Sequence, residues 1–139
     1  IAIDPGWLEW AGVAAFKNAY AEFQRLGLRA RLLSAAFRNV MHLTEFVGGD
    51  VVVSPPFAWQ RLINDNELAL PARMDQPVNP AVLGALLDRV PEFRRAWEPD
   101  GLSPAEFESF GPTSKTLRQF LDADARLDAL VRDVLVPAP

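Results

Sequence analysis

The chain has 139 residues, of which 50% are hydrophobic and 23% are charged, as is typical of a globular protein. The formal net charge is −4 and no segment gathers enough Lys or Arg to neutralise a run of phosphates, which argues against nucleic acid as a partner. The absence of cysteine excludes disulfides, thiolate catalysis and cysteine-ligated metals, and no apolar stretch approaches the ~20 residues that span a bilayer. We therefore expect a cytoplasmic protein that does not bind membranes.

Helical and extended patterns alternate in the first half of the chain. Asp4 and Pro5 have the residue types of a helix start, and Gly27 is typical of a helix end. Between and beyond them the periodicity predicts helix 8–26, strand 29–36, helix 40–47, strand 51–53 and a further helix that starts at Pro56. Helix, strand, helix, strand, helix is the order found in parallel α/β sheets.

The second half has only helical patterns. Residues 64–78 show no period and are predicted to form a loop. A helix is expected from Asn79 to Val90, after which Pro91 either kinks it or begins a new helix. Ser103 to Glu106 has the spacing of a capping box, and a long helix with one apolar face opens at Pro112 or Thr113.

Two segments of this chain resemble the transaldolase family: Ala35-Ala36-Phe37-Arg38-Asn39 at the end of the first predicted strand, and Gly48 to Pro55 around the second. The resemblance runs from about Asp4 to about Val134. It implies an α/β fold, the C-terminal part of a TIM (β/α)8 barrel. Residues 1–65 would supply two late parallel strands with flanking helices, and residues 66–139 an all-helical C-terminal segment packed on the barrel. Since a complete barrel takes about 200 residues or more, we interpret the chain as part of a longer protein.

Transaldolases transfer a dihydroxyacetone unit between sugar phosphates through a lysine Schiff base, without cofactor or metal, in the pentose phosphate pathway. The resemblance implies this activity for the intact protein, with the chain supplying the phosphate-binding part. Lys17 and Lys115 both fall in helical patterns, so we expect both to be solvated surface residues. The catalytic lysine is therefore expected upstream of this chain, and the fragment alone is expected to be inactive.

By the same resemblance Arg38 is the phosphate ligand, and its planar fork of donors suits a phosphate. The family's neighbouring serine is replaced by Ala36, and Ser34, one step deeper on the same strand face, or main-chain N–H groups would supply the missing contact. Asn39 and Ser54 are further candidates at the mouth of the barrel. Two alternatives stay open: Arg38 caps a helix or pairs with an acid, and Ser54 caps the following helix.

His42 is the only histidine and has no ligand-spaced carboxylate or cysteine beside it, so a structural role is expected and no metal site is predicted. The expected partners are a sugar phosphate and the N-terminal part of the same barrel, or a second copy in a homo-oligomer, because two parallel strands leave open edges. The alternative functions are a non-catalytic helical module that binds a protein partner through its last helix, and a transaldolase-like barrel adapted to another sugar phosphate.

Overall fold

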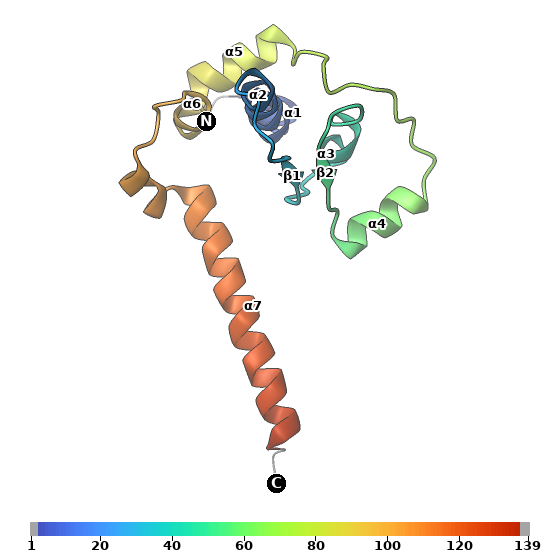
Figure 1. The fold of residues 1–139 in the computed structure, drawn as a ribbon, viewed down its shortest axis with the longest axis vertical. Helices are drawn as coiled ribbons and strands as arrows, with labels where there is room; N and C mark the ends of the chain where they lie inside the picture. Colours follow the sequence, from blue (N-terminus) through green and yellow to red (C-terminus); the bar gives the residue numbers. More distant parts are fainter. Residues whose placement is uncertain (1–2, 137–139) are drawn as a thin grey trace. The chain divides into compact units, whose positions relative to one another are not determined.

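The computed structural model describes residues 3–136, in two compact units that divide between Glu98 and Pro99 (Figure 1). The first unit contains α1 (Pro5–Leu8), α2 (Ala11–Arg25), β1 (Leu33–Ser34), α3 (Met41–Thr44), β2 (Val52–Val53), α4 (Phe57–Asn64), α5 (Pro80–Arg89) and α6 (Pro91–Trp97). The second contains a 3-10 helix, η1 (Pro104–Glu108), and α7 (Gly111–Leu135). Residues 66–98, which the sequence pattern groups with the C-terminal segment, lie within the first unit.

Capping side chains fix where two helices begin. The Asp4 carboxylate accepts the Gly6 N–H at 2.7 Å at the start of α1, and the Asn79 side chain accepts the Ala81 N–H at 2.9 Å at the start of α5. Both helices carry proline at their first position, where the missing N–H costs nothing. Pro91 begins a separate helix, α6, which decides between the two alternatives for this proline.

The hydrophobic core is made by helices and loop residues that pack around α2. On one side Ala14 of α2 is buried against Val82 and Leu86 of α5 and Phe93 of α6. On the other side Val13 is buried against Phe46 and Met74, and the ring of Phe46 stacks on Phe16 with centroids 4.1 Å apart. Because both sides of α2 are covered, this helix is the centre of the first unit.

The predicted C-terminal part of a TIM (β/α)8 barrel is wrong. β1 and β2 are parallel, with Leu33 opposite Val52 and Ser34 opposite Val53, but each strand has only two residues and no third strand exists among residues 3–136. A barrel strand pairs on both edges and is covered by helices, whereas Leu33 is 57% exposed and the core is centred on α2 and not on the sheet.

The apolar runs mislead because they indicate an extended chain without fixing how many residues pair. Of the predicted strand 29–36 only Leu33 and Ser34 join the ladder, and residues 29–31 are exposed. With no neighbouring strand to accept their hydrogen bonds, the remaining residues of each run leave the sheet. Residues 64–78 were predicted as a loop, and most of them are; only Asn64, the last residue of α4, is helical.

The second unit consists of η1 and the start of α7, which pack together, and the rest of α7. The Ser103 N–H and hydroxyl both donate to the Glu106 carboxylate, at 2.9 and 2.7 Å, as the capping-box spacing predicts. α7 begins at Gly111, slightly before the predicted start. No residue of α7 is buried, and its apolar residues are exposed: Leu117, Phe120, Leu121, Leu127, Leu130, Val131 and Val134. Within residues 3–136, every helix is too short or too polar to cross a bilayer.

Candidate functional site

The parallel pairing of β1 and β2 brings two predicted site segments to one edge of the sheet. The Val52 N–H donates to the Leu32 carbonyl and the Ser54 N–H to the Ser34 carbonyl, both at 2.8 Å. Parallel strands end at the same edge, so residues 35–39, after β1, and Ser54, after β2, leave the sheet side by side. We call these residues the carboxyl edge. In parallel sheets this is where ligands bind.

Arg38 presents its charge to solvent at the carboxyl edge. The residue is exposed, and its Nη1 donates to the Phe37 carbonyl at 3.0 Å. Within residues 3–136 no carboxylate forms an ion pair with it, and the side-chain bond at the start of α3 comes from Asn39, which accepts the Met41 N–H. The alternatives of an acid partner and of a helix cap are therefore not observed. The guanidinium keeps donors that point to no acceptor in the described part of the chain.

Of the other predicted site residues, Ser34 and Asn39 make hydrogen bonds within the protein. Ser34 is buried and its hydroxyl donates to the His42 carbonyl at 3.1 Å. Asn39 accepts the Met41 N–H at 3.0 Å and donates to the Glu9 carbonyl at 3.3 Å. Both side chains therefore hold the loop that carries Arg38. Ser34 stays a prediction as a phosphate ligand, and Asn39 as a further candidate beside it.

Ala36 and Ser54 are both exposed. Ala36 offers no side-chain donor. Ser54 does not cap α4, because that helix begins after Pro56 and has no side-chain cap at all. The Ser54 hydroxyl therefore remains a candidate ligand at the carboxyl edge.

His42 contacts this loop in a way that the sequence does not reveal. Its side chain is buried, and Nδ1 accepts the main-chain N–H of Arg38 at 3.0 Å. The ring of Phe37 meets the imidazole edge-on, with centroids 6.2 Å apart. Burial lowers the pKa of His42. The carbonyl of Ala36 raises this pKa and the charge of Arg38 lowers it, and the net shift is downward. His42 therefore has contacts of the structural kind that we expected, and these contacts are made within the candidate site.

Lys17 is not the solvated lysine that its helical pattern predicts. Its side chain is 9% exposed, and Nζ donates to the Glu45 carboxylate at 3.2 Å, the Arg73 carbonyl at 2.8 Å and the Gln76 carbonyl at 2.9 Å. The other Glu45 oxygen accepts Arg73 Nη1 at 2.9 Å. We name this group the Lys17–Glu45–Arg73 cluster. It ties the loop before α5 to α2 and to the turn after α3.

The sequence carries a signal for one member of this cluster, Glu45. Glu45 lies among apolar residues, between Leu43 and Phe46, where a carboxylate needs a cation because burial of an unpaired charge is costly. Lys115, by contrast, lies on exposed α7, as expected.

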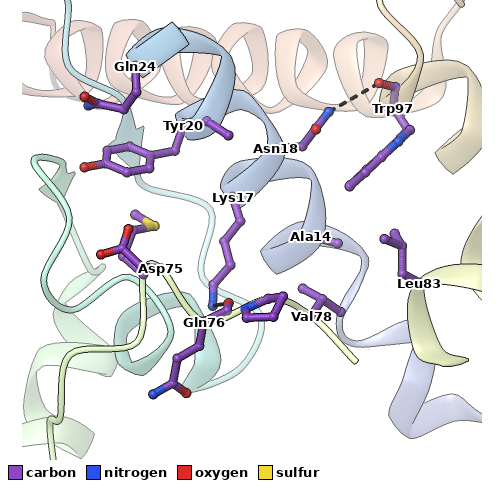
Figure 2. Close-up of a pocket in the computed structure, with 13 residues that line it drawn as sticks. Ala14, Lys17, Asn18, Tyr20, Gln24, Asp75, Gln76, Val78, Leu83 and Trp97 are labelled. Atoms are coloured by element: carbon purple, nitrogen blue, oxygen red, sulfur yellow. Dashed lines mark hydrogen bonds between the residues drawn. The ribbon is translucent and has the colours of Figure 1, made fainter. Parts of the chain in front are cut away.

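A cavity of about 530 Å³ opens beside Lys17, between α2, residues 74–78 and the helices α5 and α6 (Figure 2). Its walls are largely apolar, and Asn18 Nδ2 donates across it to the Trp97 carbonyl at 3.4 Å (Figure 2). All three N–H groups of the Lys17 ammonium are used by protein acceptors. A Schiff base needs a free amine, so this lysine does not supply one in the observed arrangement.

Comparison of the chain with protein-family models, with curated protein sequences and with solved structures gave no match. In the part of the chain that the structure describes, no three His, Asp or Glu side chains gather where they would hold a metal ion. The resemblance to transaldolases stays a prediction from the residues quoted above.

Proposed function

We propose that this chain binds the phosphate group of a sugar phosphate through Arg38, as part of an enzyme with transaldolase-type activity. One observation carries the proposal: an exposed guanidinium, without a carboxylate partner among residues 3–136, lies where two parallel strands end. Guanidinium groups bind phosphate through two parallel N–H···O bonds and are charged at every physiological pH.

The surroundings of Arg38 suit this role. The bond from Nη1 to the Phe37 carbonyl orients the planar group and leaves its other donors for a ligand. The exposed hydroxyl of Ser54, at the same edge, provides a further donor. Ser34 and Asn39 would contribute indirectly, by holding the loop in place.

The transfer chemistry itself needs a lysine that this chain does not offer. Lys17 is enclosed in its cluster, and Lys115 lies on exposed α7, without the burial that would lower the pKa of a catalytic amine. The Schiff-base lysine would therefore come from a segment outside these 139 residues. Borohydride treatment of the chain with fructose 6-phosphate should leave both lysines unmodified, and a covalent adduct on either would contradict this assignment.

The phosphate role is tested by comparing fructose 6-phosphate with fructose. Arg38→Ala should weaken binding of the phosphorylated sugar by about ten- to a hundredfold, because hydrogen bonds to charged groups contribute roughly 1.5–3 kcal/mol each. Binding of fructose should change little. Arg31→Ala is the matched control, since Arg31 precedes β1 and pairs with Asp50 at 3.4 Å. Equal losses for both sugars, or an equal effect of the control, would overturn the proposal.

A second candidate function rests on a different observation, the exposed apolar face of α7. Helical periodicity places Asp124 and Asp128 among the apolar residues of this face, whereas Lys115, Arg118 and Arg126 lie on the opposite face. The complementary partner is an amphipathic helix whose apolar stripe carries Lys or Arg. A second copy of the chain fits less well, since it offers the same carboxylates.

Two synthetic helical peptides with the same leucine stripe, one flanked by Lys and the other by Glu, test this candidate. Calorimetry should show tighter binding of the Lys peptide, and Asp124→Asn with Asp128→Asn should reduce the difference. Asp122→Asn, on the opposite face, is the control. Equal binding of the two peptides, or binding of neither, would remove the interaction module from consideration.

A further inference from the structure

The loop that carries Arg38 is built around residue 42. Three bonds or contacts meet there: the Ser34 hydroxyl donates to the His42 carbonyl at 3.1 Å, the Arg38 N–H donates to His42 Nδ1 at 3.0 Å, and the Phe37 ring meets the imidazole edge-on. The stretch of chain that leads to the exposed guanidinium, from Ser34 to Arg38, is therefore held by one residue of α3.

The imidazole itself has little room to move. An added Cβ at Gly12 of α2 would lie 2.9 Å from His42 Nε2, so the ring packs directly against a glycine. The bond to Nδ1 requires a lone pair on that nitrogen, which places the proton of the neutral ring on Nε2. A protonated ring carries N–H groups on both nitrogens and has no lone pair for the Arg38 N–H.

We propose that neutral His42 is a positioning residue for Arg38, and that phosphate binding at Arg38 weakens when His42 takes up a proton. This inference rests on the proposed phosphate role of Arg38. Protonation replaces an accepted hydrogen bond with two facing N–H groups, and it adds a positive charge beside the guanidinium. Both effects disturb the loop of residues 35–39, and the ligand loses the preorganised donor.

The other charged groups around His42 do not offset this change. Glu45, on the same helix, already accepts from Lys17 and Arg73. Glu9, between α1 and α2, is exposed and contacts the loop through its carbonyl, which accepts from Asn39. Burial lowers the pKa of His42 and the charge of Arg38 lowers it further, which together outweigh the Ala36 carbonyl that raises it, so the neutral ring is favoured.

The test uses inorganic sulfate, a tetrahedral dianion that does not itself titrate in this range, with the 139-residue chain at about pH 8 and about pH 5. Sulfate affinity of the unaltered chain should fall about fivefold on acidification, the scale of one lost hydrogen bond. The added charge on His42 and the protonation of surface carboxylates would by Coulomb attraction alone strengthen anion binding, so the expected sign is opposite to the general electrostatic trend.

Two variants separate positioning from a general structural role. In His42→Asn the side-chain oxygen replaces Nδ1 as an acceptor but does not titrate, so affinity should stay near the value at high pH throughout. In His42→Phe the acceptor is lost, so affinity should be low at both pH values. Gly12→Ala displaces the ring from the other side and should act like His42→Phe if that variant does not fold.

A second readout is independent of any ligand. The nuclear magnetic resonance scalar coupling between the Arg38 amide nitrogen and His42 Nδ1 should be present at about pH 8 and disappear as the ring titrates. Sulfate affinity that ignores pH, or that falls equally in His42→Asn, would overturn the role of His42. Absence of sulfate binding at both pH values while the coupling behaves as expected would overturn the phosphate role of Arg38, and the proposal with it.

Discussion

Two cations in the first unit, Lys17 and Arg38, donate to main-chain carbonyls, and they differ in how many of their N–H groups have a protein acceptor. In the Lys17–Glu45–Arg73 cluster the ammonium is buried and each of its N–H groups has a protein acceptor. At the carboxyl edge the Arg38 guanidinium is exposed and uses one bond to the Phe37 carbonyl. A cation whose donors are all used stabilises the fold, whereas a cation with donors to spare is available to a ligand.

The largest expected effect comes from breaking the buried cluster. Glu45→Gln removes the charge that faces Lys17 and should lower the free energy of unfolding by about 3 kcal/mol, because a buried ammonium is left uncompensated. Asp50→Asn is the matched control, since it removes the same charge from the exposed pair with Arg31 and should cost less than about 1 kcal/mol. Urea unfolding of both variants measures the contrast, and equal losses would show that burial does not distinguish the two ion pairs.

The helical core predicts a second contrast, between the two units. Leu86 is fully buried, so Leu86→Ala should cost about 2–5 kcal/mol in unfolding free energy. Leu130 of α7 is 62% exposed, and Leu130→Ala should stay within about 0.5 kcal/mol. Urea midpoints of the two variants provide the measurement. A large loss for Leu130→Ala would mean that α7 is covered in solution.

Two glycines give a prediction with opposite signs. Gly48 has φ +91° and an added Cβ would lie 2.9 Å from the Cβ of Ala72, so Gly48→Ala should destabilise by about 1–2 kcal/mol. Gly84, inside α5, has open space around it, and Gly84→Ala should stabilise by about 0.5–1 kcal/mol. Thermal unfolding of both variants distinguishes these outcomes; a stabilised Gly48→Ala would contradict the packing of Gly48 against Ala72 in the loop before α5.

The smallest effect concerns pH. The folded pKa of His42 is lowered, so the unfolded chain binds the proton more readily, and stability should decrease as the pH falls below the unfolded value of about 6.5. Above that value the contribution is fully present. The difference in stability between His42→Asn and the unaltered chain should therefore shift on acidification. A constant difference from about pH 8 to about pH 5 would show that the imidazole titrates alike in both states.

Local signals in the sequence predicted local structure. Asp4, Asn79 and the Ser103–Glu106 pair act as their residue types and spacing indicate, because a cap depends on a few neighbouring residues. Two parallel strands were also expected, and both exist. The barrel was wrong because strand length and sheet neighbours depend on distant parts of the chain, and residues 29–36 find only a two-residue partner.

In the candidate site, too, the local features could be predicted from the sequence and the features that depend on distant residues could not. The place of Arg38 after a strand was readable from the pattern of residues 33–39. The sequence did not reveal that Arg38 has no acid partner in the described part of the chain. It also did not reveal the bond from the Arg38 N–H to His42, which depends on how the loop folds back. The burial of Lys17 depends on residues 28 to 59 positions away, so it could not be predicted from the helical periodicity around Lys17.

One titration tests the contrast between these two cations most directly. Inorganic phosphate is added to the 139-residue chain while nuclear magnetic resonance follows the Arg38 side-chain Nε–H and the Lys17 ammonium together. The expected result is a saturable shift of the Arg38 signal and an unmoved Lys17 signal, since only the guanidinium has donors to spare. A saturable shift at Lys17, or an Arg38 signal that does not respond to phosphate, would contradict the account.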